Sequence, residues 1–214
     1  MLEWPDAGES TRGLIDGPDG PLEVSVGRPD EATGGLVLVC HPHPQQGGTL
    51  DNKVTYMMAR AAVEAGYTAV RFNFRGVGES GGGFDDGVGE VDDARAVRDW
   101  ALEASGEPLA GVCGFSFGSA VALRLAAGDG APRLMTVGFP AAYFDGPPPR
   151  PEAEWLAIFG DADDVIDVDA SIAAVRALEP PVDVQILAGA GHFLHGRLTD
   201  LRQRVIAFLD SDEG

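Results

Sequence analysis

Apolar residues along this chain form short runs that alternate with longer amphipathic segments. The short runs are bounded by glycine, proline or aspartate, which is typical of buried β-strands. Strands are predicted at residues 36–40, 67–74, 109–115, 134–139, 155–159 and 182–187. Helical spacing and cap residues predict helices at 52–65, 92–104, 117–125, 169–178 and 198–209, with Asp51 as the cap of the first. This alternation favours a mostly parallel central sheet with helices on both faces and functional groups in loops at the strand carboxyl ends.

Two further segments complete the predicted α/β domain. Residues 12–16 and 22–27 are β-like and flank the turn-forming residues 17–20, so they predict an N-terminal β-hairpin. Residues 145–151 contain four prolines and a glycine but are too few for a lid domain, so we expect open access to the site. Since no internal repeat or domain boundary is found, residues 1–214 are expected to form a single domain.

Composition narrows the range of functions. With 214 residues, 44% of them hydrophobic, the chain is large enough to bury one core, and its apolar runs are far shorter than a membrane span. The first eight residues carry acids and a proline where a secretory signal is basic and then apolar, so a cytoplasmic location is expected. A net charge of −19 would repel nucleic acid and anionic lipid, whether or not it also reflects a salt-rich habitat. We expect a small-molecule acyl substrate, and the oligomeric state stays open.

Cys40 and Cys113 both lie inside apolar, strand-like runs. Free cysteine in such a setting usually packs as a small buried hydrophobic residue. A disulfide would also require suitable Cβ directions and an oxidising compartment, so we expect two free thiols.

A candidate nucleophile stands at the end of the strand predicted at 109–115. Residues 114–118 read Gly-Phe-Ser-Phe-Gly, which matches the pattern Gly-x-Ser-x-Gly. In a chain with 30 glycines the bare pattern arises easily by chance, but here a strand precedes it and a helix follows. A serine at so tight a turn is strained, and a glycine two residues to either side lets the backbone bend without a Cβ clash. We therefore predict Ser116 as the nucleophile; the alternative is that it only caps the helix.

A serine nucleophile needs a neighbouring base at neutral pH, and the chain offers four histidines. His192 lies in a loop of small residues directly after the last predicted strand, so it reaches toward the strand carboxyl ends, where the serine also stands. We choose His192 as the base, with His195, at the start of the final helix, as the second candidate. For the side chains of His41 and His43 we favour a structural role, in which the rings pack or bond locally.

The acid that orients the imidazole should lie between the nucleophile and the base in the chain, at the end of a strand. Residues 159–164 read Phe-Gly-Asp-Ala-Asp-Asp and offer three aspartates. We choose Asp163, because a glycine at the strand end followed by a short turn would bring its side chain back over the sheet. Asp161 and Asp164 are then exposed or capping, and Asp164 is the next candidate.

Together these residues resemble the α/β-hydrolase superfamily, in which the nucleophile, the acid and the histidine follow in this order. The similarity extends from about residue 36 to residue 209. More narrowly, His-Pro-His-Pro at 41–44, Gly-Gly-Thr-Leu-Asp-Asn-Lys at 47–53 and Arg-Phe-Asn-Phe-Arg-Gly-Val-Gly-Glu-Ser at 71–80 resemble a lidless bacterial and archaeal subgroup similar to dienelactone-hydrolase and serine-aminopeptidase-like proteins. The resemblance implies an α/β-hydrolase fold without a lid domain. Dienelactone hydrolases proper carry a cysteine nucleophile, so the serine here does not favour lactone-specific chemistry.

The resemblance also implies an oxyanion hole made of two backbone N–H groups. One belongs to Phe117, the residue after the nucleophile. The other comes from the loop that follows the strand at 36–40, which in the superfamily commonly starts His-Gly. Pro42 stands in place of that glycine, and by position the donor is His43. Pro44 cannot serve because it has no N–H.

A site of this kind transfers acyl groups to water and needs no cofactor. No metal is expected either, because His-Pro-His at 41–43 lacks cysteine or carboxylate ligands at a suitable spacing. The loop at 75–80 is expected to border the site, and it lacks the Lys-Ser/Thr that would make it a phosphate-binding loop.

We expect a carboxylesterase-like serine hydrolase of small esters, while the physiological substrate and the acyl-chain preference stay open. A thioesterase or an aminopeptidase is the first alternative. In an aminopeptidase, Asp85, Asp86 or Glu90 would supply an acidic pocket for the substrate amine. The second alternative is a catalytically silent binding module that kept the same fold.

Overall fold

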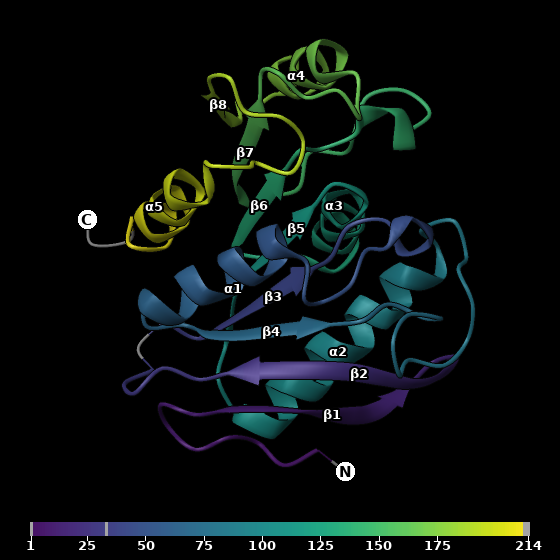
Figure 1. Ribbon diagram of the computed structural model, residues 1–214, viewed down its shortest axis with the longest axis vertical. Coiled ribbons are helices and arrows are strands. Elements are labelled where there is room, and N and C mark those ends of the chain that lie inside the picture. The colour runs from purple at the N-terminus through teal and green to yellow at the C-terminus, as the bar shows by residue number, and fades with distance from the viewer. Residues whose placement is uncertain (1, 33, 212–214) are drawn as a thin grey trace.

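A central β-sheet carries the fold, and the computed structural model describes it within residues 2–32 and 34–211 (Figure 1). The sheet has eight strands in the order β1-β2-β4-β3-β5-β6-β7-β8. They are β1 (Ser10–Gly17), β2 (Gly20–Gly27), β3 (Leu36–Cys40), β4 (Thr68–Phe72), β5 (Leu109–Phe115), β6 (Arg133–Val137), β7 (Glu154–Gly160) and β8 (Asp183–Leu187). Strands β3 to β8 are parallel, whereas β2 is antiparallel to β4 and forms an edge hairpin with β1. The first residue of the acidic N-terminal segment lies outside the described residues.

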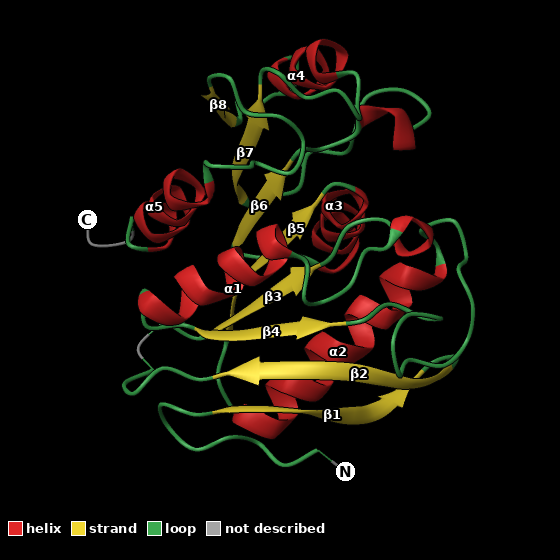
Figure 2. Ribbon diagram, in the orientation of Figure 1, coloured by secondary structure: helices red, strands yellow, loops and turns green. Residues whose placement is uncertain are grey.

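Helices cover both faces of this sheet (Figure 2). They are α1 (Lys53–Glu64), α2 (Gly89–Ser105), α3 (Phe117–Asp129), α4 (Val168–Arg176) and α5 (Leu198–Leu209), with the short 3₁₀ helices η1 (Pro44–Gln46) and η2 (Ala141–Tyr143). Helices α1 and α5 pack on one face and share a core with Val37 and Val39 of β3. Helices α2 and α3 pack on the other face, against Leu36 and Leu38. Successive residues of one buried strand thus supply two separate cores, because side chains alternate across a strand.

Within the described part of the chain, no helix is both long and apolar enough to cross a membrane.

The predicted order of strands and helices is confirmed, and the differences lie at their ends. Strand β6 ends two residues earlier than predicted, because Gly138 turns the chain with a φ of 57°. Helix α2 begins at Gly89, three residues earlier than predicted. The Glu90 carboxylate accepts hydrogen bonds from the Asp85 and Gly87 amides and so closes the loop before the helix. This earlier start could not be predicted from the sequence, because the amides that the Glu90 carboxylate reaches depend on the path of the folded chain.

The cap of α1 is Asn52, and the prediction of Asp51 is wrong. The Asn52 side-chain oxygen accepts hydrogen bonds from the amides of Val54 and Thr55, at 2.9 and 3.4 Å. The two neighbouring residues are equally good caps by type. Tertiary contacts decide between them, because the Asp51 carboxylate instead pairs with arginines of β1 and β4, at 2.7 and 3.4 Å.

Both cysteines are free and buried, as predicted. They lie on the neighbouring strands β3 and β5, where Val39 pairs with Cys113 and Cys40 pairs with Gly114. The two thiols therefore point to opposite faces of the sheet, each into a different core. Burial raises the pKa of Cys113 to about 12, and it raises the pKa of Cys40 well above its ordinary value, so both thiols stay protonated.

We expect Asn52→Ala to lower the free energy of unfolding by about 1 kcal/mol, because two amides at the start of α1 lose their acceptor. Urea denaturation measures the change. Asn52→Asp is the matched control, since it keeps an acceptor at the same place and should stay within about 0.5 kcal/mol of wild type. A larger loss of unfolding free energy in Asp51→Ala than in Asn52→Ala would indicate that Asp51 caps α1.

Candidate active site

Ser116 occupies the sharp turn between β5 and α3. Its φ of 53° and ψ of −124° are a conformation that residues other than glycine rarely adopt. Its amide donates to the Val137 carbonyl at 2.8 Å, and its own carbonyl accepts from the Ser119 amide at 2.8 Å. The side chain makes no cap hydrogen bond with α3, so the alternative in which Ser116 only caps that helix is wrong. The hydroxyl is free to act outside the helix.

The glycines on either side of Ser116 let three pieces of backbone meet. A Cβ on Gly114 would lie 2.2 Å from the carbonyl oxygen of Gly118. A Cβ on Gly118 would lie 2.3 Å from the carbonyl oxygen of His41 and 2.5 Å from that of Cys40. Neither position has room for a side chain. The first turn of α3 therefore lies directly against the end of β3, where the loop with His43 begins.

His192 lies in the loop between β8 and α5, and its side chain meets Ser116. The distance from His192 Nε2 to Ser116 Oγ is 2.9 Å. The His192 ring is held by the rings of Phe115 and Phe193, at centroid distances of 5.0 and 5.2 Å. A Cβ on Gly138 would lie 3.2 Å from His192 Cε1, so the backbone of Gly138 closes another side of the ring. The imidazole is 3% exposed and has little freedom to turn away from the serine.

Asp163 approaches the opposite edge of the same imidazole. Its Oδ2 lies 2.7 Å from His192 Nδ1, and its Oδ1 accepts hydrogen bonds from the amides of Val165 and Ile166, at 2.9 and 3.1 Å. Burial by itself would raise the pKa of Asp163, but the hydrogen bonds from His192 and from the two amides outweigh it and lower that pKa below its ordinary value. An ionised Asp163 accepts the Nδ1 proton, which leaves the Nε2 lone pair facing Ser116.

The other two aspartates of this loop do not reach His192. The Oδ1 atom of Asp161 accepts a hydrogen bond from the Gly189 amide at 2.5 Å. The Ala162 amide donates to the Ala190 carbonyl at 3.0 Å. Asp161 thus ties its own loop to the loop that carries His192, and Asp164 is exposed. Both match the expectation of exposed or capping residues.

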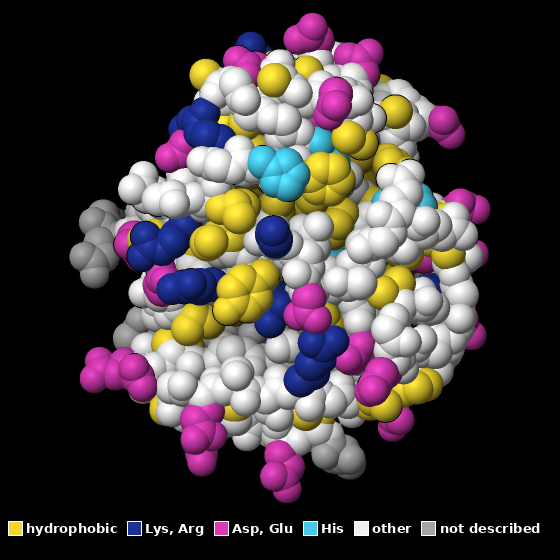
Figure 3. Space-filling view, viewed as in Figure 1, with side chains coloured by type: hydrophobic (Ala, Val, Ile, Leu, Met, Phe, Trp, Pro, Cys, Tyr) yellow, Lys and Arg dark blue, Asp and Glu magenta, His cyan; other side chains and the backbone are white. Residues whose placement is uncertain are grey.

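His195 is exposed and lies outside the hydrogen-bonded set. It borders a groove of about 370 Å³ together with Phe193, Leu198 and residues 47–54 at the start of α1. In the space-filling view, histidine and apolar side chains lie side by side near the middle of the face that α1 and α5 cover (Figure 3). This groove runs from the loop after His192 to the loop after His43, and its lining residues include neither Ser116 nor His192.

The rings of His41 and His43 pack and bond locally, as predicted, although His41 also bonds far along the chain. His41 Nε2 accepts a hydrogen bond from the Phe74 amide, 33 positions away, at 3.0 Å. Burial lowers the pKa of His41 to about 4, so its ring is neutral near neutral pH. The His43 ring accepts from the Gln45 amide at 3.2 Å and stacks at 5.1 Å from the ring of Phe117.

The backbone amides of Phe117 and His43 stand on segments that touch. Phe117 is the first residue of α3, and His43 directly precedes η1. Among the described residues, neither N–H has a hydrogen-bond acceptor. The first amides of a helix have no partner inside it, and they carry its positive end. Both N–H groups are therefore free to donate to an acceptor from outside the described chain.

An aromatic wall beside His43 was not identified from the sequence. The ring of Phe84 lies 4.9 Å from the His43 ring, and the ring of Tyr143 lies 5.6 Å from that of Phe117. Phe84 stands in a polar, glycine-rich loop and Tyr143 in the short helix η2 before the proline-rich stretch, and no periodicity marks a contact at either place. Loop residue Arg75 does not face this wall, because it forms a buried ion pair with Asp93 of α2 at 2.8 Å.

The acids proposed for an amine pocket are mostly engaged in their own loop. Glu90 is wholly buried and accepts hydrogen bonds from the amides of Asp85 and Gly87. The Asp85 carboxylate accepts from the Gly89 amide at 3.0 Å. Of the three candidates, Asp86 is the exposed one that makes no hydrogen bond within the described residues.

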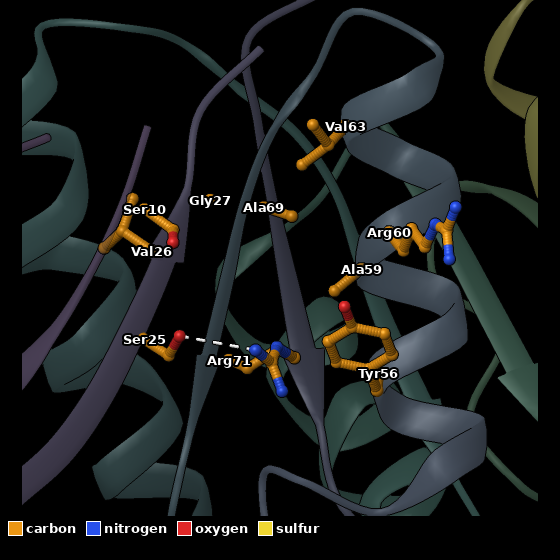
Figure 4. A pocket seen from close by; sticks show the side chains of 10 residues that line it. All are labelled: Ser10, Ser25, Val26, Gly27, Tyr56, Ala59, Arg60, Val63, Ala69 and Arg71. Carbon is orange, nitrogen blue, oxygen red and sulfur yellow. Dashed lines mark hydrogen bonds between the residues drawn. The ribbon is translucent and has the colours of Figure 1, made fainter. Parts of the chain in front are cut away.

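A separate hollow of about 210 Å³ lies over β2, β4 and α1 (Figure 4). Arg71 crosses it, donating a hydrogen bond to Ser25 at 3.3 Å and covering the ring of Tyr56 at 4.9 Å. Its lining residues include none of the groups around Ser116, so it is a different site.

Comparisons with known proteins agree with this architecture. The model of the X-Pro dipeptidyl-peptidase (S15) family matches residues 16–146. An uncharacterized protein of Rickettsia prowazekii is 32% identical in an alignment 209 residues long, which covers 91% of this chain and 87% of that protein. The solved structure of an α/β serine hydrolase homologue from Coxiella burnetii is 37% identical with a TM-score of 0.89, covering 97% of this chain and 100% of the other. An α/β serine hydrolase without lid from Xanthomonas campestris is 41% identical with a TM-score of 0.88, covering 95% and 94%. The predicted lidless α/β-hydrolase fold is confirmed.

The lowered pKa of Asp163 predicts how its contribution to stability varies with pH. A carboxylate whose pKa is lower in the folded than in the unfolded state stabilises the protein fully above about pH 4, and the effect is lost as the pH falls through the folded value. The unfolding free energies of wild type and Asp163→Asn, measured in urea from pH 7 to pH 3, should therefore converge toward acid. A difference that does not change with pH would contradict an ionised Asp163.

Proposed function

Because the chain belongs to the X-Pro dipeptidyl-peptidase (S15) family and to the lidless α/β serine hydrolases, we propose that it hydrolyses small carboxylic esters through an acyl-enzyme on Ser116. One observation carries this proposal. Ser116 Oγ, His192 and Asp163 form a continuous hydrogen-bonded chain, with distances of 2.9 and 2.7 Å. These two hydrogen bonds join a strained nucleophile to a base and the base to an ionised acid. Acyl transfer at neutral pH requires such an arrangement.

The proposed reaction has two halves that use the same histidine. As Ser116 Oγ attacks the ester carbonyl carbon, His192 Nε2 takes the hydroxyl proton, and Asp163 stabilises the imidazolium. The tetrahedral intermediate collapses by breaking the bond to the alkoxy oxygen, which receives the proton from His192 and leaves as the alcohol. Water then attacks the acyl-enzyme with His192 again as base, releasing the acid and restoring the serine.

Two amides support the negative charge that develops on the carbonyl oxygen. We assign these roles to the N–H groups of Phe117 and His43, which have no other acceptor among the described residues. Fixed donors of this kind stabilise the oxyanion without any reorganisation during the reaction. The positive end of α3 acts in the same direction.

The acids near the site do not by themselves separate ester hydrolysis from aminopeptidase activity. Glu90 and Asp85 accept hydrogen bonds from amides of their own loop, whereas Asp86 is exposed and could meet a substrate amine, so a peptide panel is needed beside the esters. Thioesters use the same triad chemistry, so substrate panels rather than geometry separate them from esters.

We expect Ser116→Ala to lower the turnover of short-chain 4-nitrophenyl esters by roughly 10⁴-fold or more, since the nucleophile is lost. His192→Ala should act similarly, and Asp163→Asn should cost roughly 10⁴-fold by leaving the wrong tautomer. A fluorophosphonate probe provides the control, because it should label wild type and fail to label Ser116→Ala. Unlabelled wild type, or equal labelling of Ser116→Ala, would favour a silent binding module. Parallel acyl-thioester and X-Pro peptide substrates rank the alternatives.

The role of the His43 amide can be tested by replacing its N–H with the ring methylene of a proline. His43 has a φ of −51°, which proline adopts without strain, and its N–H makes no hydrogen bond within the described chain. We expect His43→Pro to lower kcat by about 10²- to 10³-fold with little change in KM, as loss of one oxyanion donor does. His43→Ala keeps the N–H and loses the same ring, so its kcat should fall much less than that of His43→Pro. Equal kcat values for the two variants would contradict a role of the His43 amide in the oxyanion hole.

A further inference from the structure

His41 is a wholly buried histidine that the proposed reaction does not use. It follows the last residue of β3, and both of its ring nitrogens are engaged. The Phe74 amide can only donate, so His41 Nε2, at 3.0 Å, must accept. The proton of the neutral ring is therefore on Nδ1, which donates to the Pro42 carbonyl oxygen at 2.6 Å. Its partners thus determine the tautomer of His41.

The carbonyl that His41 holds belongs to the same peptide group as the His43 amide. Within the described residues the one cis peptide bond is Glu179–Pro180, so the bond between Pro42 and His43 is trans. In a trans peptide the C=O and the N–H point in opposite directions across a rigid plane. A hydrogen bond that fixes the Pro42 oxygen therefore also fixes the direction of the His43 N–H.

We propose that His41 is a positioning residue of the oxyanion hole, which orients the His43 N–H by holding the carbonyl at the other side of the same peptide. This inference rests on the proposed function, because the His43 amide has a role only if an oxyanion forms at Ser116. It assigns a purpose to a polar side chain in a position that packing alone would fill with an apolar one.

A second contact holds this peptide from another side. A Cβ on Gly48 would lie 2.1 Å from the Pro42 oxygen and 2.7 Å from the His43 oxygen. The Gly48 amide also donates to the His43 carbonyl at 3.0 Å. The Pro42–His43 peptide is thus confined between the His41 ring and the backbone of Gly48.

The far side of the His41 ring is anchored to the segment that follows a different strand, β4. Its Nε2 bond to Phe74 joins the oxyanion loop to the residues directly after β4. The ring of Phe74 lies 4.5 Å from the His41 ring and 5.7 Å from the ring of Phe117. Because burial keeps the imidazole neutral, no second ring proton opposes the Phe74 amide near neutral pH.

Two substitutions separate the two hydrogen bonds of His41. In His41→Asn the side-chain nitrogen stands close to the place of Nδ1 and can still donate to Pro42. In His41→Gln the longer side chain reaches the place of Nε2, so its oxygen can accept from Phe74 but nothing holds Pro42. We expect His41→Gln to lower kcat for 4-nitrophenyl acetate by about 10- to 100-fold, with KM changed less than about threefold. His41→Asn should recover most of that loss.

A double-mutant cycle with His43→Pro distinguishes positioning from general support of the fold. If His41 acts through the His43 N–H, His41→Gln should cost nothing further once that N–H is absent. If His41→Gln lowers kcat by the same factor in wild type and in His43→Pro, the inference is overturned and His41 has a purely structural role.

Gly48→Ala is an independent probe if His41→Gln does not fold, as judged by thermal unfolding. Its new methyl group would press on the Pro42 oxygen, so kcat should fall in the wild-type background and not in the His43→Pro background. Additive losses here would also overturn the inference while Ser116-dependent turnover persists. Absence of that turnover in wild type would instead overturn the proposed function, and the inference with it.

Discussion

The close approach of helix α3 to the ends of β3 and β5 is the constraint on which the site depends. This approach requires bare backbone at Gly114 and Gly118, where any Cβ would overlap carbonyl groups. It forces Ser116 into a positive φ, which turns its side chain out of the helix. It also brings the first amide of α3 beside the loop that starts at His41. The strained serine and the place of the Phe117 amide beside this loop are thus consequences of one packing contact.

Around this contact, side chains hold loops that have no regular structure of their own. Asp163 binds two backbone amides as well as His192, and Asp161 joins the loop after β7 to the loop after β8. Glu90 closes the loop before α2, and His41 joins the loops after β3 and β4. Asp163, Glu90 and His41 have buried side chains, and buried polar groups must be paired, so their loops have few alternative conformations. A protein without a lid can therefore still present a rigid site.

The sequence predicted the fold well because its signals are local. Alternating apolar runs, helix-forming segments and turn residues each depend on neighbours within a few positions, and the strands at 36–40 and 109–115 were predicted to the residue. The errors occur where distant residues decide. Asn52 rather than Asp51 caps α1 because arginines of β1 and β4 engage Asp51. The early start of α2 likewise depends on which amides the Glu90 carboxylate reaches.

The sequence by itself determined the class of fold, the serine at the turn after β5 and the order of serine, acid and histidine along the chain. Each is a matter of residue type and spacing, which the chain carries before it folds. Only the tertiary structure decided which carboxylate meets His192, because the path of that loop depends on Gly160, where a Cβ would lie 2.1 Å from the Ala190 oxygen. It also decided the tautomer and neutral state of His41, since burial and the hydrogen bond from the distant Phe74 amide exist only in the folded protein.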